Sequence, residues 1–254
     1  MPEQSQPSSV AAAGTVSPPS LVELISSGVV DAELAALVWL LVEGRVPLVV
    51  AAPSGRLEAG AQLLRGVLAS IRPEIDLDGL DRPIGAAAAG SLVRGRRAGG
   101  VIEAGSLQAV RAALAQGPLP LSEDQLSFLG CVLVLGATEP AGRGPRRGRL
   151  RVTAAHYVRP LARDAHGHAQ LLPPAILGSW DERLGRYEHF AWGVLPEIAA
   201  RLGRRTGDLE RDLHHRRDDL AGLVAARVTS LADVRRLVAG YRMAYGDHRG
   251  HPAS

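Results

Sequence analysis

The sequence predicts an α/β fold: a parallel sheet with helices, then a small antiparallel β-meander and a C-terminal helical segment. Three observations predict it. Short apolar runs alternate with helix-length amphipathic stretches in the first half, as in parallel sheets with crossover helices. A loop rich in Gly, Pro and Arg at 138–149 interrupts this pattern, and strands of alternating polarity follow. From about residue 193 onward the apolar spacing is helical.

The composition restricts the chemistry that is available. The chain has no lysine and no asparagine, so all 29 of its basic side chains are arginine, set against 26 acids for a net charge of +3. A Schiff base and a phosphate-binding lysine are therefore excluded. The high isoelectric point follows from the pKa of arginine rather than from a large excess of cations, so a nucleic-acid partner is not required.

The single cysteine and the lengths of the apolar segments indicate the cellular compartment of the protein. Cys131 lies in the run 131–135, which is typical of a buried strand, and one cysteine cannot form an intrachain disulfide. No segment approaches the roughly 18 apolar residues of a membrane span, and the N-terminus lacks a secretory pattern. We expect a cytoplasmic protein with no membrane span.

The N-terminal elements follow from capping residues and periodicity. Residues 1–19 are Ser, Pro, Gln and Ala with little to bury, which predicts a disordered tail. Ser20 can cap a short helix, and Asp31 can cap a longer one that ends at Gly44. Trp39 lies within this second helix and is expected to face the core or to be half-buried.

A strand, a glycine-containing turn and a helix come next. The apolar run 46–51 predicts a buried strand, residues 52–56 a turn, and 57–71 a helix. This is the skeleton of a phosphate-binding unit. The expected elements that follow are a strand at 74–77, a helix at 86–97, a strand at 101–103, helices capped by Ser106 and Ser122, and a strand at 131–135.

The second half of the chain predicts the meander and the helices. Its expected strands are 150–158, 169–177 and 187–190, and its expected helices are 194–202, 208–226 and 230–245. The expected division of the chain is a tail at 1–19, an α/β domain at 20–137, a loop at 138–149, a β-unit at 150–192, a helical segment at 193–247 and a tail at 248–254.

Several segments resemble the type II/type IV secretion and pilus-assembly ATPases, a P-loop family. The helix and strand over 21–50 are similar to those that lead into the family's Walker A loop, and 121–135 and 150–153 resemble later elements. Aligning Leu63 and Leu64 with the family's leucine pair places Gly60 at the lysine position and Ala61 at the magnesium-binding hydroxyl. No acidic Walker B strand is found. The resemblance therefore implies a degenerate member of the family.

This resemblance implies a weak cofactor position and no catalytic residues. The degenerate Walker A position comprises Ser54, Gly55, Arg56, Gly60 and Ala61, where backbone N–H groups and a helix N-terminus could hold an anion. No cofactor is expected, although binding of ATP or ADP without Mg²⁺ stays open. Phosphoryl transfer depends on positioning and charge stabilisation, so loss of the lysine and the metal ligands should abolish useful hydrolysis.

The expected function is that of a non-hydrolysing pseudo-ATPase, a regulatory or structural partner of secretion or pilus motors. Its partner would be a protein: an active ATPase of this kind, or a second copy in a homo-oligomer. One alternative is a weak nucleotide hydrolase in which Arg56 supplies charge. Another is an arginine-rich nucleic-acid-binding module.

The nucleic-acid alternative depends on an arginine cluster that includes Arg146, Arg147 and Arg149. No aromatic residues are interleaved with these arginines to stack bases, so a solvated basic loop is the favoured interpretation. No metal site is predicted either, because the histidines lack zinc-ligand spacing.

Overall fold

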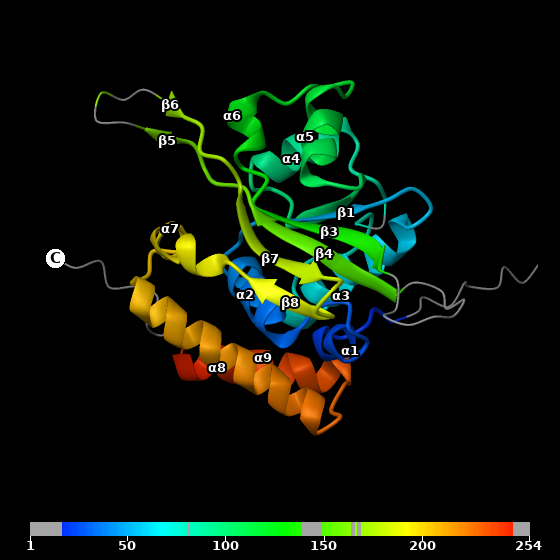
Figure 1. Cartoon of the computed structure of the whole chain (residues 1–254), viewed down its shortest axis with the longest axis vertical. Coiled ribbons are helices and arrows are strands. Elements are labelled where there is room, and N and C mark those ends of the chain that lie inside the picture. The colour runs from blue at the N-terminus through cyan, green and yellow to red at the C-terminus, as the bar shows by residue number, and fades with distance from the viewer. Residues whose placement is uncertain (1–16, 81, 139–148, 164–165, 167–168, 246–254) are drawn as a thin grey trace, which may run out of the picture.

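The computed structural model describes residues 17–80, 82–138, 149–163, 166 and 169–245. Within this part of the chain a mixed six-stranded sheet runs in the order β2-β1-β3-β4-β7-β8 (Figure 1). Its strands are β1 (Leu48–Ala52), β2 (Gly99–Glu103), β3 (Cys131–Thr138), β4 (Arg149–Tyr157), β7 (Ala175–Asp181) and β8 (Arg186–His189). A separate two-stranded hairpin consists of β5 (Ala162–Arg163) and β6 (Ala169–Gln170).

Nine α-helices lie within the described residues. They are α1 (Leu21–Ser26), α2 (Ala32–Glu43), α3 (Leu57–Ile71), α4 (Ala86–Val93), α5 (Leu107–Ala115), α6 (Glu123–Leu126), α7 (Leu195–Arg201), α8 (Thr206–Ala225) and α9 (Leu231–Tyr245). A 3₁₀ turn, η1 (Ala191–Gly193), precedes α7.

The sheet changes from parallel to antiparallel at β3. Strand β1 pairs in parallel with both β2 and β3, whereas β3–β4, β4–β7 and β7–β8 are antiparallel. The predicted α/β class and the antiparallel meander are confirmed in this form. The meander does not form a sheet of its own, because β4 pairs directly with the last strand of the parallel part and extends it.

Alternate side chains of the central strands feed two apolar clusters, one on each face of the sheet. On β1, Leu48 and Val50 face the larger cluster and Val49 and Ala51 the smaller one. Helices α4, α5 and α6 cover the smaller cluster; α1, α2 and α3, with α8 and α9 beyond them, cover the larger (Figure 1). Period-two alternation in a doubly covered sheet explains the near-continuous apolar strands.

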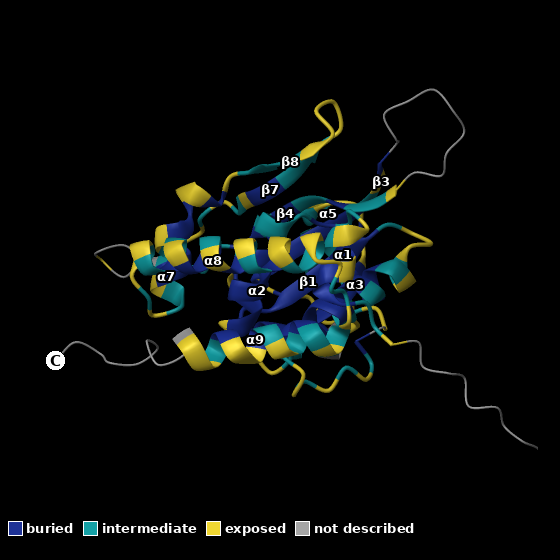
Figure 2. Cartoon of the chain, turned by 90° about the horizontal axis from the view of Figure 1, so that it is seen from below, coloured by how far each residue is buried: buried dark blue, intermediate teal, exposed yellow. Residues whose placement is uncertain are grey.

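Helix α2 is the centre of the larger cluster. The Asp31 side chain accepts a hydrogen bond from the Leu34 amide, so the predicted cap is confirmed. Ten of its twelve residues are buried, including Trp39, which is fully buried as expected. The helix lies between α8 and α9, as Figure 2 shows. A helix that is apolar on all sides belongs in such an enclosed position.

Other expected helix starts are confirmed by side-chain hydrogen bonds. Ser20 and Glu23 form a capping box at α1, and Ser122 and Gln125 form another at α6. Ser106 caps α5 by accepting from the Ala109 amide. Each cap satisfies an N–H group that the helix itself leaves without a partner.

Three expected elements differ from the structure. Residues 74–77 form turns and bends rather than a strand, and among the described residues only the bridge from Pro83 to Val101 pairs with the outer edge of β2. The helix expected at 86–97 ends at Val93. The strand expected at 169–177 is two strands, β6 and β7, because the prolines at 173 and 174 between them lack the N–H groups of a ladder.

Parts of the expected division lie outside the described residues: most of the tail at 1–19, most of the loop at 138–149, and the last residues of the chain. Within the described residues, no helix combines the length and the apolar character needed to cross a membrane.

Candidate functional site

The candidate site is the turn between β1 and α3. Strand β1 has parallel neighbours on both sides, and the chain leaves it for β2 on one side and later returns to β3 on the other. The carboxyl end of β1 is therefore a topological switch point of the sheet. Ligands of open α/β sheets bind at such points, so this is where a bound phosphate is expected.

The turn itself is short and tight. The Arg56 N–H donates to the Pro53 carbonyl at 3.0 Å, and Gly55 has a φ of 74°, a left-handed conformation that glycine adopts without strain. Ser54, Gly55 and Arg56 are all exposed. Four residues separate the end of β1 from the start of α3. A Walker A loop places six residues, from glycine to glycine, before its lysine.

The N-terminus of α3 is open to solvent but already carries negative charge nearby. No side chain caps the helix, so amide N–H groups of its first turn are free of a side-chain acceptor. Glu58 lies in this first turn, where a carboxylate interacts favourably with the helix dipole. Glu103 is exposed at the end of β2, in register with Ala52. Two carboxylates and one arginine do not favour a polyphosphate.

The other two residues of the predicted position face away from the turn. Gly60 and Ala61 are buried in α3, against the sheet. A Cβ atom on Gly60 would lie 3.0 Å from the Cβ of Ala52 and 3.0 Å from a methyl carbon of Val101. Gly60 therefore allows α3 to pack closely on β1 and β2. The structure exposes Ser54, Gly55 and Arg56 together, whereas Gly60, whose N–H donates to the Arg56 carbonyl at 3.1 Å, and Ala61 are buried in the first turns of α3.

The structure describes only part of the arginine cluster. Arg146 and Arg147 lie outside the described residues, and Arg149 is exposed at the first position of β4. Arg151, two positions later, is structural: its guanidinium donates to the Gly28 carbonyl and lies 3.9 Å from the ring centroid of Trp180. Of the three arginines predicted as anion or nucleic-acid contacts, Arg149 alone lies within the described residues.

Two potentially reactive side chains lie elsewhere in the described part of the chain. Cys131 is fully buried, and burial raises the pKa of its thiol to about 12, so the thiol stays protonated. Burial lowers the pKa of His156 on β4. Among the residues that the structure describes, no three His, Cys, Asp or Glu side chains are grouped as metal ligands.

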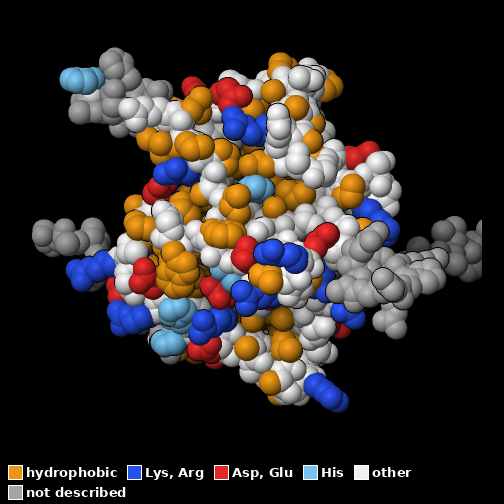
Figure 3. Space-filling model, viewed as in Figure 1, with side chains coloured by type: hydrophobic (Ala, Val, Ile, Leu, Met, Phe, Trp, Pro, Cys, Tyr) orange, Lys and Arg blue, Asp and Glu red, His pale blue; other side chains and the backbone are white. Residues whose placement is uncertain are grey.

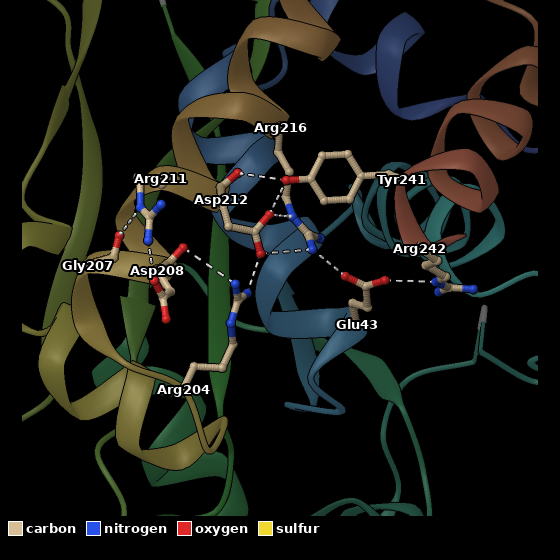
Figure 4. A network of polar contacts seen from close by, with 9 residues as sticks. All are labelled: Glu43, Arg204, Gly207, Asp208, Arg211, Asp212, Arg216, Tyr241 and Arg242. Atoms are coloured by element: carbon tan, nitrogen blue, oxygen red, sulfur yellow. Dashed lines mark hydrogen bonds and ion pairs between the residues drawn. The ribbon is translucent and has the colours of Figure 1, made fainter. Parts of the chain in front are cut away.

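The main polar cluster joins α2, α8 and α9 (Figure 4). Arg216 is 2% exposed and binds Asp212 at 2.7 Å and Glu43 at 2.6 Å. Its guanidinium lies 4.5 Å from the ring centroid of Trp39 and 4.7 Å from that of Tyr241. The hydroxyl of Tyr241 donates to Asp212. Arg204 and Arg242 pair with the outer sides of Asp212 and Glu43.

The sequence did not reveal this cluster. The alternating charges of α8 are typical of a solvated face or of a seam for a partner helix, and Asp212 and Arg216 are in fact buried within the chain itself. Their spacing of four residues on one helix was the available signal, but exposed ion pairs show the same spacing. The core of the cluster is buried, both of its carboxylates are paired with arginines, and its contacts join three helices. We assign it a structural role.

A shallow apolar hollow lies on another part of the surface. It has a volume of 410 Å³ and is lined by Leu107, Gln108, Arg111, Ala112, Ala115, Glu123 and Pro174. Arg111 and Glu123 form an ion pair with each other. Figure 3 shows hydrophobic side chains gathered on this face between the β5–β6 hairpin and the helices α5 and α6. The hollow offers apolar contact but no unpaired charge for an anion.

No protein-family model matches the chain, and no curated protein matches it.

Proposed function

We propose that this chain is a non-hydrolysing relative of the secretion and pilus-assembly motors that acts through protein contacts, as a regulatory or structural partner. The observation that carries the proposal is the turn after β1. It stands at the switch point of the sheet, where a P-loop protein would hold phosphate, but it is short and lacks the charge for the task.

The electrostatics of the turn support the loss of hydrolysis. Phosphoryl transfer requires fixed positive charge around the γ-phosphate and a bound metal ion. Arg56 is the one basic side chain of the turn, and its exposed position leaves its charge screened by water. Glu58 and Glu103 add negative charge beside it. Removing the usual cations from such a site is expected to slow hydrolysis by several orders of magnitude.

The first experiment measures nucleotide binding and hydrolysis. ATP and ADP are titrated into the purified chain by calorimetry, with and without Mg²⁺, and phosphate release is followed separately. We expect no hydrolysis above background and no saturable heat at high micromolar protein. The Arg56→Ala variant tests the turn, and Arg183→Ala, an exposed arginine of the β7–β8 turn, is the matched control.

Hydrolysis that disappears in Arg56→Ala and persists in Arg183→Ala would overturn the proposal in favour of a weak ATPase. The partner role needs a second measurement. We expect the chain to bind a secretion or pilus ATPase of the same cell and to change its hydrolysis rate at stoichiometric concentration. An unchanged rate with no complex would refute that role even if the chain proves inactive.

A further inference from the structure

Strand β8 is the outer strand of the antiparallel half of the sheet. It pairs with β7 on one side and with no other described strand on the other. Figure 2 shows it at the rim of the molecule, with β7 inside it. An edge strand presents unpaired backbone groups that can pair with another chain.

The register shows which backbone groups point outward. In the β7–β8 ladder Ser179 is opposite Glu188, and the Phe190 N–H donates to the Leu177 carbonyl at 2.9 Å. Hydrogen-bonded pairs alternate along an antiparallel ladder, so Arg186 and Glu188 bond to β7. The backbone groups of Tyr187 and His189 therefore point away from the sheet. Within the described residues, no hydrogen bond reaches them.

Because only alternate residues of β8 point their backbone groups outward, few registers are open to a second copy that pairs with β8. In an antiparallel two-fold pair, outward-pointing residues must lie opposite one another. Two registers satisfy this condition near the centre of β8. One is centred on Tyr187 and places Arg186 opposite Glu188 of the other copy, twice. The second is centred on Glu188 and places two like charges opposite each other, which is unfavourable.

The register centred on Tyr187 also matches apolar residues. It brings together the segments that flank β8, where Leu184 in the preceding turn and Phe190 just after the strand are each 48% exposed. Within β8 the register pairs a basic with an acidic side chain on each side of Tyr187, and exposed apolar side chains flank the strand at both ends.

The strand is also held rigidly from its inner side. The Tyr187 hydroxyl donates to the Val29 carbonyl at 2.7 Å, and His189 contacts Asp31 at 2.8 Å. Ordering a strand on binding opposes association, and a strand that is already fixed avoids that penalty. Both anchoring contacts lie on the inner face and leave the outward backbone groups available.

We propose that β8 is a self-association edge, at which two copies of this chain pair antiparallel about Tyr187 and join their sheets. Arg186 and Glu188 set the register. The edge is short, so the buried area is below that of a standard stable interface and the dimer is weak, with a dissociation constant on the order of 10–100 μM.

The test is a charge swap measured by sedimentation velocity over a concentration series. Glu188→Arg and Arg186→Glu each replace two attractive pairs with repulsive ones, so each should weaken the dimer at least about tenfold. The double variant R186E/E188R restores opposite charges and should return the dissociation constant to within about threefold of the original. Far-UV circular dichroism and thermal melting establish that every variant is folded.

Matched controls on the neighbouring turn are Glu182→Arg and Arg183→Glu, which make the same charge changes away from the paired positions. They should leave the dimer within about twofold. Hydrogen exchange supplies a separate readout, since the amides of Tyr187 and His189 should gain protection as concentration rises. A chain that stays monomeric at several hundred micromolar, or a dimer that the swap does not rescue, would overturn the proposal.

Discussion

The substitution Arg216→Met tests whether the buried ion cluster holds the C-terminal helices on α2. Methionine keeps the apolar length of the side chain and removes its charge. Arg216 contacts Asp212 on its own helix, Glu43 on α2 and the ring of Tyr241 on α9. The change therefore leaves two buried carboxylates, Asp212 and Glu43, without their shared cation.

The magnitude follows from what remains. Removing one member of a buried ion pair lowers the free energy of unfolding by about 3–5 kcal/mol, because the other charge stays buried without a partner. Here Arg204 still pairs with Asp212 and Arg242 with Glu43. The loss should fall at the lower end, about 3 kcal/mol. Burial by itself would raise the pKa of Asp212, but hydrogen bonds and charge from Arg216, with Tyr241 and Arg204, lower it.

The assay is urea unfolding followed by far-UV circular dichroism at neutral pH. Arg217→Met is the control: its side chain is 36% exposed and pairs with the exposed Asp218, so the change should alter the free energy of unfolding by less than about 0.5 kcal/mol. The double variant D212L/R216M removes a buried acid together with its cation and should recover much of the loss. A loss below about 1 kcal/mol for Arg216→Met, the size of a surface pair, would refute the assigned role.

Three further predictions concern β8 and two glycines. Burial by itself would lower the pKa of His189, but its hydrogen bond with Asp31 and the nearby acid charge outweigh burial and raise it. The contribution of this pair to the free energy of unfolding is therefore full below pH 6.5 and is lost as the pH rises through the folded pKa. In urea unfolding, His189→Gln should remove this dependence of the free energy of unfolding on pH above 6.5. Gly130→Ala should lower the melting temperature, with a loss of at least about 2 kcal/mol, since Gly130 has a φ of 77° and its Cβ would lie 2.6 Å from the Pro47 carbonyl oxygen. Gly60→Lys should destabilise the chain without creating ATP affinity in calorimetry; tight binding by a stable Gly60→Lys protein would contradict the packing role.

Local signals predicted much of the fold because they depend on neighbouring residues alone. The caps at Ser20, Asp31, Ser106 and Ser122 are present as expected, since each needs only a side-chain oxygen and an amide two or three residues away. The buried strand at Cys131 is also present as expected, since a short continuous apolar run is typical of a strand in a sheet that is covered on both faces.

Non-local pairing is what the sequence could not determine. The segment around Ile75 and Leu77 has the pattern of a strand, but a strand forms only beside a neighbouring edge. In the described part of the chain, the outer edge of β2 forms a single bridge, to Pro83. For the same reason, the sequence did not predict that the parallel and antiparallel strands form one continuous sheet. Nothing local indicates that β4 pairs with β3 across the loop between them.

The candidate site shows the same division between local and non-local information. The strand, turn and helix around Gly55 are all present, and they are what the sequence pattern specifies. The pattern does not specify how closely α3 approaches the sheet, and that distance decides the role of Gly60. A glycine at this place in a βα unit can serve phosphate or can serve close packing. A Cβ on Gly60 would lie 3.0 Å from side-chain carbons of Ala52 and Val101, which supports the second role whether or not the turn holds an anion. The binding question therefore reduces to the exposed amides and the single cation of a four-residue turn, flanked by Glu58 and Glu103, which is the question that calorimetry on Arg56→Ala addresses.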